Sequence, residues 1–265
     1  MAFGQDLKIL PTIILKIFSI PIVIRTDGRF SNFVTSKLKK KLFMTMENFN
    51  YQIAEIILTE NEYMIESNKL PKEKSKTLKM GISIEDSVIK NVSTRKFDIG
   101  FIGRFEIEKG IYNFIEAIKK IDGNYSIIII GQGTEQDKVL NSLTNTNIKI
   151  YNWLNQDDLN SILGELKILV VPSYREGLPN IIIESMAKGC LVVANKVGGI
   201  PGILINEFNG FLIEDNNPNT IKEKLNHILM RNDLDNIQKN AIMTIKEQFD
   251  CNKIKMSYKE IINKI

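Results

Sequence analysis

Short runs of isoleucine and valine alternate with longer stretches of mixed polarity from residue 97 onward. The five runs read "FDIGFIG", "YSIIIIG", "IKIYN", "KILVVPS" and "CLVVANK". Between them, apolar residues recur at helical spacing, for example over 110–121 and 179–188. Aliphatic runs joined by amphipathic helices are typical of a parallel sheet covered on both faces. The pattern predicts a doubly wound α/β domain over about 97–213, with helices carrying the chain to its end.

The first 83 residues carry a thinner version of this pattern. We expect strands at "IPIVIR", "AEIILTE" and "TLKMG", a helix over 31–46, and an earlier helix that ends near Ser19. Three strands are too few for a complete doubly wound domain. The prediction is therefore an α/β protein with a partial N-terminal domain and linker over 1–95 and a complete, Rossmann-like C-terminal domain over 96–265.

Positive charge is concentrated in the front of the chain. Residues 1–95 contain 15 Lys and Arg against 10 Asp and Glu, whereas the whole chain has a net charge of only +4. In the helix expected over 31–46, apolar residues recur every four positions, and four lysines lie off that face: Lys37, Lys39, Lys40 and Lys41. Two interpretations fit: a helix that meets anionic lipid, or one that packs on its sheet with a solvated basic face.

Other features limit the class of protein. Cys190 and Cys251 match no metal or redox spacing, which fits a reducing compartment. The apolar start lacks the basic region and cleavage site of a signal peptide, and it is too short and too interrupted to span a bilayer. We expect a cytoplasmic protein, with peripheral membrane contact as an option and no nucleic-acid partner.

The stretch "REGLPNIIIE" at 175–184 carries the most specific chemistry. It follows a predicted strand and opens a helix near Pro179, and ligands bind at this edge of an open α/β sheet. The amides of Gly177 and Leu178 would form a phosphate seat. A carboxylate beside that seat would repel phosphate, so Glu176 is expected to accept hydrogen bonds from sugar hydroxyls. Glu184 suits a second diol, such as a ribose.

Two cations follow the first strand of the same domain, in "GRFEIEKG". Arg104 and Lys109 would neutralise a diphosphate there, with arginine able to make a bidentate contact. The alternative is a surface ion pair with Glu106 or Glu108. With these cations and helix amides present, no metal is required, and "DLD" at 233–235 is expected to be a solvated turn.

Taken together, these motifs resemble glycosyltransferase family 4, retaining transferases of the GT-B fold. The resemblance is carried by "GR....KG" at 103–110, "GQG" at 131–133, the long motif at 171–201 and "NGFLIE" at 209–214. It implies a nucleotide-sugar donor and no metal cofactor. It also implies that Arg104 and Lys109 hold the diphosphate, with amides from Gly177 and Leu178. Glu176 would contact the donor sugar and Glu184 the ribose.

The chain departs from the family pattern in its first domain. No glycine-rich loop precedes "IPIVIR", and the opening strands are expected to be missing. Where many members read His-Asp this chain reads "RTDG", so Asp27 joins Glu176 as a candidate catalytic residue. The only histidine, His227, falls in a late helix and is expected to have no catalytic role. Trp153, in the loop that binds the base in the family, either packs on the base or belongs to the core.

The sequence thus predicts a retaining glycosyltransferase that moves a sugar from a nucleotide diphosphate to a glycan or lipid-linked acceptor. Missing strands would impair transfer, because the first domain positions the acceptor. The main alternative is a non-catalytic or split-enzyme protein that binds nucleotide sugar. An epimerase would require acid and base groups that the sequence does not offer.

Overall fold

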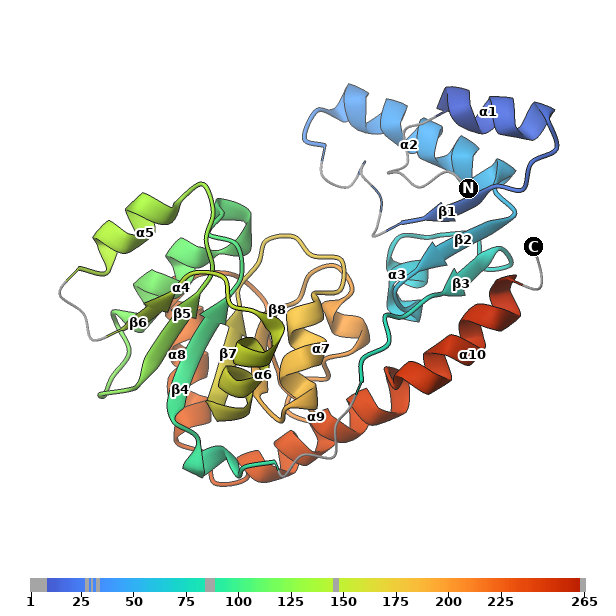
Figure 1. Cartoon of the computed structure of the whole chain (residues 1–265). Helices are drawn as coiled ribbons and strands as arrows, with labels where there is room; N and C mark the ends of the chain where they lie inside the picture. Colours follow the sequence, from blue (N-terminus) through green and yellow to red (C-terminus); the bar gives the residue numbers. More distant parts are fainter. Residues whose placement is uncertain are drawn as a thin grey trace. The chain divides into compact units, whose positions relative to one another are not determined.

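The computed structural model describes residues 9–26, 29, 31, 34–83, 89–144 and 148–262 of the 265-residue chain. The chain divides into two compact units, Met1–Gly81 with Cys251–Ile265, and Ile82–Asp250. The first unit therefore ends at Gly81, whereas the sequence analysis ended the first domain, with its linker, at residue 95. The last helix, α10 (Cys251–Ile262), belongs to the first unit rather than to the second (Figure 1).

A six-stranded sheet, parallel throughout, forms the centre of the second unit, in the order β6-β5-β4-β7-β8-β9. The strands are β4 (Phe97–Ile102), β5 (Ile127–Ile130), β6 (Lys149–Tyr151), β7 (Leu166–Val171), β8 (Leu191–Asn195) and β9 (Phe211–Ile213). The first five coincide with the five aliphatic runs, which confirms the predicted parallel sheet. The sequence analysis did not assign β9 as a strand, and its residues entered only as part of the motif "NGFLIE".

Helices alternate with these strands along the chain. They are α4 (Ile111–Ile118), α5 (Gln136–Ser142), α6 (Gln156–Glu165), α7 (Asn180–Ala187), α8 (Pro218–Leu229) and α9 (Leu234–Gln248). Short 3-10 turns lie at η2 (Val92–Thr94), η3 (Ile107–Lys109) and η4 (Ile200–Gly202). The chain leaves β4 towards β5 and β6, then returns to the other side of β4 as β7. The strand order therefore reverses between β4 and β7, which is where such sheets bind ligands.

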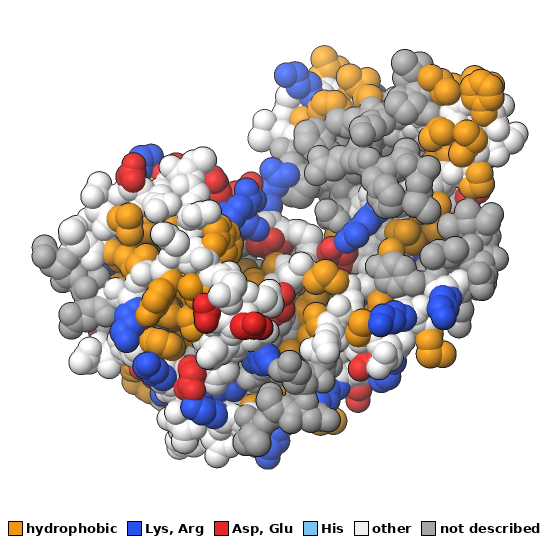
Figure 2. Space-filling view, in the orientation of Figure 1, with side chains coloured by type: hydrophobic (Ala, Val, Ile, Leu, Met, Phe, Trp, Pro, Cys, Tyr) orange, Lys and Arg blue, Asp and Glu red, His pale blue; other side chains and the backbone are white. Residues whose placement is uncertain are grey.

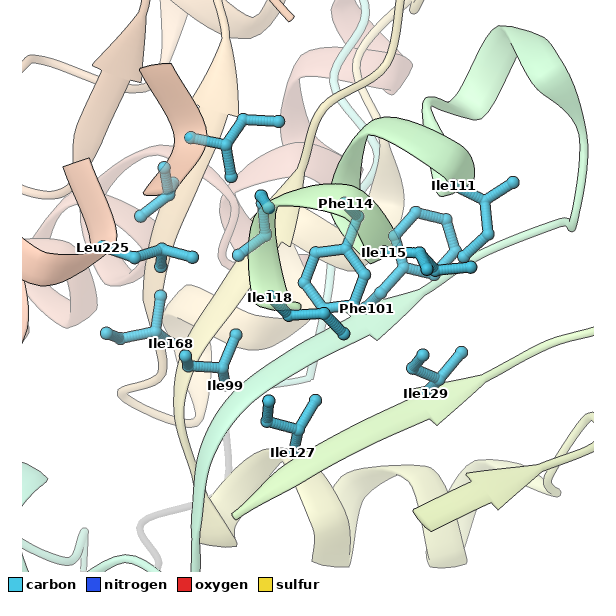
Figure 3. Packing of buried hydrophobic residues seen from close by; sticks show 14 of the residues in the cluster. Ile99, Phe101, Ile111, Phe114, Ile115, Ile118, Ile127, Ile129, Ile168 and Leu225 are labelled. Carbon is cyan, nitrogen blue, oxygen red and sulfur yellow. The ribbon is translucent and has the colours of Figure 1, made fainter. Parts of the chain in front are cut away.

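Each face of this sheet has its own hydrophobic core. Ile99, Phe101, Ile127 and Ile129 point to one face, where α4 and α8 cover them (Figure 3). The alternate residues of the same strands, such as Ile128 and Ile130, point to the other face and pack with α6, α7 and α9. Burial on both faces explains why the strands read as continuous aliphatic runs instead of alternating polar and apolar positions.

The first unit contains a three-stranded parallel sheet in the order β1-β2-β3, in the part of the chain that the structure describes. Its elements are α1 (Ile9–Ile17), β1 (Val23–Arg25), α2 (Lys37–Ile53), β2 (Ile56–Thr59), α3 (Glu62–Ser67) and β3 (Ser75–Thr77), besides α10. The prediction of a strand over 77–81 was wrong except at Thr77. The apolar residues that suggested it, Leu78 and Met80, follow the strand.

Helix α2 begins later and ends later than the helix that the sequence analysis expected over 31–46. The face that it buries is not the one formed by the apolar residues that recur every four positions. Its buried residues are Glu47, Asn50 and Tyr51, whereas Leu38 is 81% exposed and Leu42 58% exposed. Leu38 and Leu42, two of the apolar residues that recur every four positions, therefore do not pack on the sheet of this unit. Among the described helices, none is both long enough and apolar enough to cross a bilayer.

Phe114 provides a test of the core between α4 and the sheet. Its side chain is fully buried, and its ring centroid lies 5.5 Å from that of Phe101. Phe114→Ala should lower the free energy of unfolding by about 3–5 kcal/mol because it leaves a cavity. Urea denaturation of the wild type and the variant measures this loss. Met230→Ala, at a position that is 80% exposed, is the control and should change stability by less than about 0.5 kcal/mol.

Candidate functional site

A cavity of about 330 Å³ lies at the carboxyl ends of β4 and β7, beside the start of α7. Four of the predicted site residues line it: Arg104, Lys109, Glu176 and Glu184. Figure 2 shows acidic and basic side chains together over this edge of the second unit. The topology brings these residues to one place because β4 and β7 are neighbours and run in the same direction.

An ion pair joins Lys109 to Glu176 inside the cavity. Lys109 Nζ lies 2.8 Å from Glu176 Oε1 and 2.9 Å from Oε2, with the two side chains 21% and 9% exposed. Lys109 ends the turn η3, and Gly110 follows in the left-handed conformation (φ 71°), which redirects the chain into α4. The sequence analysis considered Glu106 and Glu108 as ion-pair partners, and Lys109 pairs with Glu176 instead.

Ser173 also contacts Glu176, and the sequence analysis did not single it out. Its hydroxyl donates to Glu176 Oε1 at 2.6 Å, and the residue is only 2% exposed. The Ser-x-x-Glu spacing is a common local hydrogen-bonding pattern and could have drawn attention to it. Ser173 and Lys109 together fix the carboxylate at the edge of the cavity.

Arg104 pairs with Glu108 across an exposed turn at 2.8 Å, with side chains 56% and 45% exposed. This is the surface ion pair that the sequence analysis kept as an alternative. Exposed pairs of this kind contribute little stability, so the guanidinium can exchange Glu108 for a ligand at small cost. Arg104 still lines the cavity.

Glu184 lies on α7 and is half-buried at the cavity wall. Burial raises the pKa of its carboxyl, and a hydrogen bond from the Gln156 side chain partly opposes that rise. Pro179 occupies the N-cap position of α7 rather than the first helical turn. The helix thus begins one residue later than expected, and Glu184 still lies on it, about one turn from its start.

Gly177 and Leu178 lie in the loop before α7. The carbonyl of Gly177 accepts a hydrogen bond from the Gly199 amide at 2.6 Å, and the Leu178 side chain is buried in the core beneath α7. Neither residue is among the described residues that line the cavity. The use of their amides as a phosphate seat stays a prediction.

Trp153 lines the cavity and is 47% exposed, so it is not a core residue. It lies in the loop between β6 and α6, and Leu159 of α6 lines the same cavity. This outcome removes one of the two interpretations that the sequence left open. A half-exposed indole at the wall of a cavity offers a flat surface for stacking.

The glycine-rich loops serve close contact between protein segments. A Cβ on Gly131 would lie 1.9 Å from the carbonyl oxygen of Gly103, and one on Gly133 would lie 2.5 Å from that of Phe105. The loops after β4 and β5 therefore pack backbone against backbone. Gly198 does the same against Glu176, where a Cβ would lie 1.8 Å from the carbonyl oxygen.

Three other sequence candidates lie away from this cavity or cannot be placed. Asp27 lies outside the described residues. His227 is exposed in the last turn of α8. In the "DLD" stretch, Asp233 pairs with Arg231 at 2.7 Å and Asp235 accepts from the Val92 amide at 3.0 Å, so both carboxylates have partners within the protein.

Solved structures with the same fold include the Anabaena protein HepE in complex with UDP, with a TM-score of 0.78 at 19% identity. The superposition covers 96% of this chain and 75% of HepE. Sucrose-phosphate synthase from Thermosynechococcus elongatus gives a TM-score of 0.76 at 18% identity, over 92% of this chain and 68% of that enzyme. The chain therefore has the α/β, GT-B-type fold of these transferases.

Sequence relatives include an uncharacterized glycosyltransferase of Methanocaldococcus jannaschii, 29% identical over 220 residues. That match covers 82% of this chain and 60% of the relative, so the chain spans less than two thirds of the relative's length. A second relative is the Escherichia coli UDP-Gal:alpha-D-GlcNAc-diphosphoundecaprenol alpha-1,3-galactosyltransferase, 32% identical over 138 residues, 48% of this chain and 35% of that enzyme. The family model described as glycosyl transferases group 1 matches residues 83–244, more than half of the chain, and the chain belongs to this family.

Proposed function

We propose that this chain binds a nucleotide-diphosphate sugar in its second unit, as part of a retaining transferase that delivers the sugar to a glycan or lipid-linked acceptor. The observation that carries the proposal is the cavity at the switch point, where Arg104, Lys109, Glu176 and Glu184 meet. Two relatives support the ligand class, since HepE binds UDP and the E. coli enzyme is named for UDP-Gal and a diphosphoundecaprenol acceptor. UDP is therefore the first nucleotide to test.

The charges in the cavity suit such a donor. Lys109 neutralises Glu176 when no ligand is bound. With a donor in place, the ammonium would lie between the carboxylate and the diphosphate and reduce their repulsion. Arg104 would add a bidentate contact to the phosphates. These two cations would stabilise the departing diphosphate electrostatically, so that transfer requires no metal.

The remaining groups divide the donor between them. Glu176 would accept hydrogen bonds from sugar hydroxyls, and Glu184 from the ribose hydroxyls. The Trp153 indole, which lines the same cavity as Glu184, would stack on the base. Ionising Glu184 in its half-buried place is unfavourable, as its raised pKa indicates, and two hydroxyl donors would offset that cost. Asp27 would contact the acceptor side; this assignment rests on the sequence alone.

A second function is possible for the chain as it stands: binding of nucleotide sugar without transfer. All the described residues that line the cavity belong to the second unit, and donor binding there does not by itself require transfer to an acceptor. Incubation of the chain with radiolabelled UDP-sugars and a membrane extract distinguishes the two. Label transferred to lipid or glycan supports a transferase, whereas tight donor binding with no transfer supports the binding function.

Calorimetric titration tests the division of roles in the cavity. The wild type should bind UDP saturably in the presence of a chelator. Glu184→Ala should weaken UDP binding by about 1.5–3 kcal/mol, because hydrogen bonds to a charged group are lost. Glu176→Ala should leave UDP binding unchanged and weaken only the UDP-sugar that the wild type prefers.

The matched control is Glu116→Ala, a carboxylate on the exposed side of α4 with no place in the cavity. It should bind both ligands as the wild type does. UDP binding that requires added divalent cation would contradict the metal-free site. Equal losses for UDP and UDP-sugar in both Glu176→Ala and Glu184→Ala would contradict the assignment of separate roles.

We also propose that α2 contacts an anionic membrane surface, which would bring the first unit to a lipid-linked acceptor. Leu38 and Leu42 are exposed, and the ten residues 37–46 contain four lysines and no acidic residue. Figure 2 shows hydrophobic and basic side chains next to one another over α2. An apolar stripe with flanking lysines is the arrangement of an interfacial helix.

Vesicle sedimentation tests this contact. Binding to vesicles that contain phosphatidylserine should decrease as salt rises, because exposed charges are screened within about 8 Å at physiological ionic strength. A fourfold Lys→Gln change at positions 37, 39, 40 and 41 should abolish it, and Leu38→Gln with Leu42→Gln should weaken it. The control is the same fourfold change at Lys69, Lys72, Lys74 and Lys76, elsewhere in the first unit. If both fourfold variants bind alike, α2 is not the contact surface.

A further inference from the structure

Three asparagine side chains hold the loop that follows β7, at three consecutive residues. Asn216 Nδ2 donates to the carbonyl oxygen of Pro172 at 2.7 Å, and Asn195 Nδ2 donates to that of Ser173 at 3.1 Å. The hydroxyl of Tyr174 donates to Asn113 Oδ1 at 3.2 Å. We call Asn113, Asn195 and Asn216 the asparagine cradle. They come from α4, from the end of β8 and from the loop between β9 and α8.

The cradle is connected within itself as well as to the loop. Asn195 Nδ2 also donates to Asn216 Oδ1, and Asn113 Nδ2 donates to the backbone carbonyl of Asn216 at 2.5 Å. Asn195 and Asn216 are 6% and 7% exposed. Buried amides with several partners have one favourable orientation, because turning either one leaves polar groups unpaired. The cradle is therefore a rigid support.

Two glycines allow neighbouring segments to approach the backbone of the same loop closely. A Cβ on Gly110 would lie 2.1 Å from the carbonyl oxygen of Pro172, and one on Gly198 would lie 1.8 Å from that of Glu176. Both glycines have positive φ, 71° and 56°. The Gly199 amide donates to the carbonyl oxygen of Gly177 at 2.6 Å. The whole stretch from Pro172 to Gly177 is thus held through its backbone.

The loop presents one charged side chain to the cavity, Glu176. Its carboxylate is oriented by the Ser173 hydroxyl, whose residue is itself held by Asn195. Of the described residues that line the cavity, none belongs to the cradle. The cradle can therefore influence a ligand only through Ser173 and Glu176.

We propose that Asn113, Asn195 and Asn216 are positioning residues that set the Glu176 carboxylate for recognition of the donor sugar. The inference rests on the proposed function, in which Glu176 contacts the sugar and Glu184 the nucleoside. Loss of the cradle would let the loop move and weaken the sugar contact. The nucleoside contact of Glu184 and the diphosphate contacts of Arg104 and Lys109 come from other elements and would be kept.

The measurement is the ratio of two dissociation constants, for UDP and for the UDP-sugar that the wild type binds best among UDP-glucose, UDP-galactose and UDP-N-acetylglucosamine. In Asn216→Ala this ratio should fall about tenfold, as expected when hydrogen bonds to a charged group are weakened. Affinity for UDP alone should stay within about twofold of the wild type. Asn113→Ala lies at a less buried position, so it should fold even if Asn216→Ala does not, and its ratio should fall in the same direction.

Asn209→Ala is the matched control. Asn209 is a fully buried asparagine of the same unit that accepts from the Ile205 amide and donates to the carbonyl of Ile203 and to Thr244. This variant should lose thermal stability as Asn216→Ala does, with the ratio unchanged. An unchanged ratio in both Asn216→Ala and Asn113→Ala would overturn the positioning role and leave the cradle a stabilising feature only. A wild type that binds neither UDP nor a UDP-sugar would overturn the proposed function and this inference with it.

Discussion

The parallel pairing of β4 with β7 is the constraint on which the rest of the second unit depends. Phe97, Ile99 and Gly100 lie opposite Leu166, Ile168 and Leu169. A glycine at position 100 leaves room for the buried Leu166 side chain, which would lie 2.7 Å from an added Cβ. Because the two strands run together and end at the same edge, the segments that follow them meet. One brings Arg104 and Lys109, the other brings Ser173 and Glu176, and the cavity forms between them.

Within that cavity the energetic problem is charge in a partly buried place. Lys109 and Glu176 neutralise each other, because a partly buried charge without its partner would cost free energy of folding. Among the described residues no cation is paired with Glu184, and burial raises the pKa of its carboxyl. These partly buried charges are the physical basis on which a donor with hydroxyl groups and a diphosphate is proposed.

The first unit shows a different balance between sequence and packing. In α2 the apolar stripe faces solvent, and a polar residue, Glu47, is fully buried. Glu47 is satisfied there by the amide and the hydroxyl of Ser31, at 3.0 and 2.6 Å. A buried carboxylate with such partners can replace an apolar contact, although periodicity alone gives no sign of it. For this reason the sequence predicted that a helix exists here but left open which of the two interpretations of its apolar residues holds.

The sequence by itself determined the features that depend on local patterns of residues. The aliphatic runs determined that β4 to β8 are strands of a parallel sheet, and the spacing of Glu176 and Glu184 placed one before α7 and the other on it. The tertiary structure decided which partners meet. It paired Lys109 with Glu176, left Arg104 with Glu108, and built the cradle from asparagines far apart in the chain. It also assigned alternate residues of each strand to separate cores. The physical reason is that hydrophobic periodicity reports burial, and runs buried on both faces are uniform, so they say nothing about which face, neighbour or counter-ion a residue will meet.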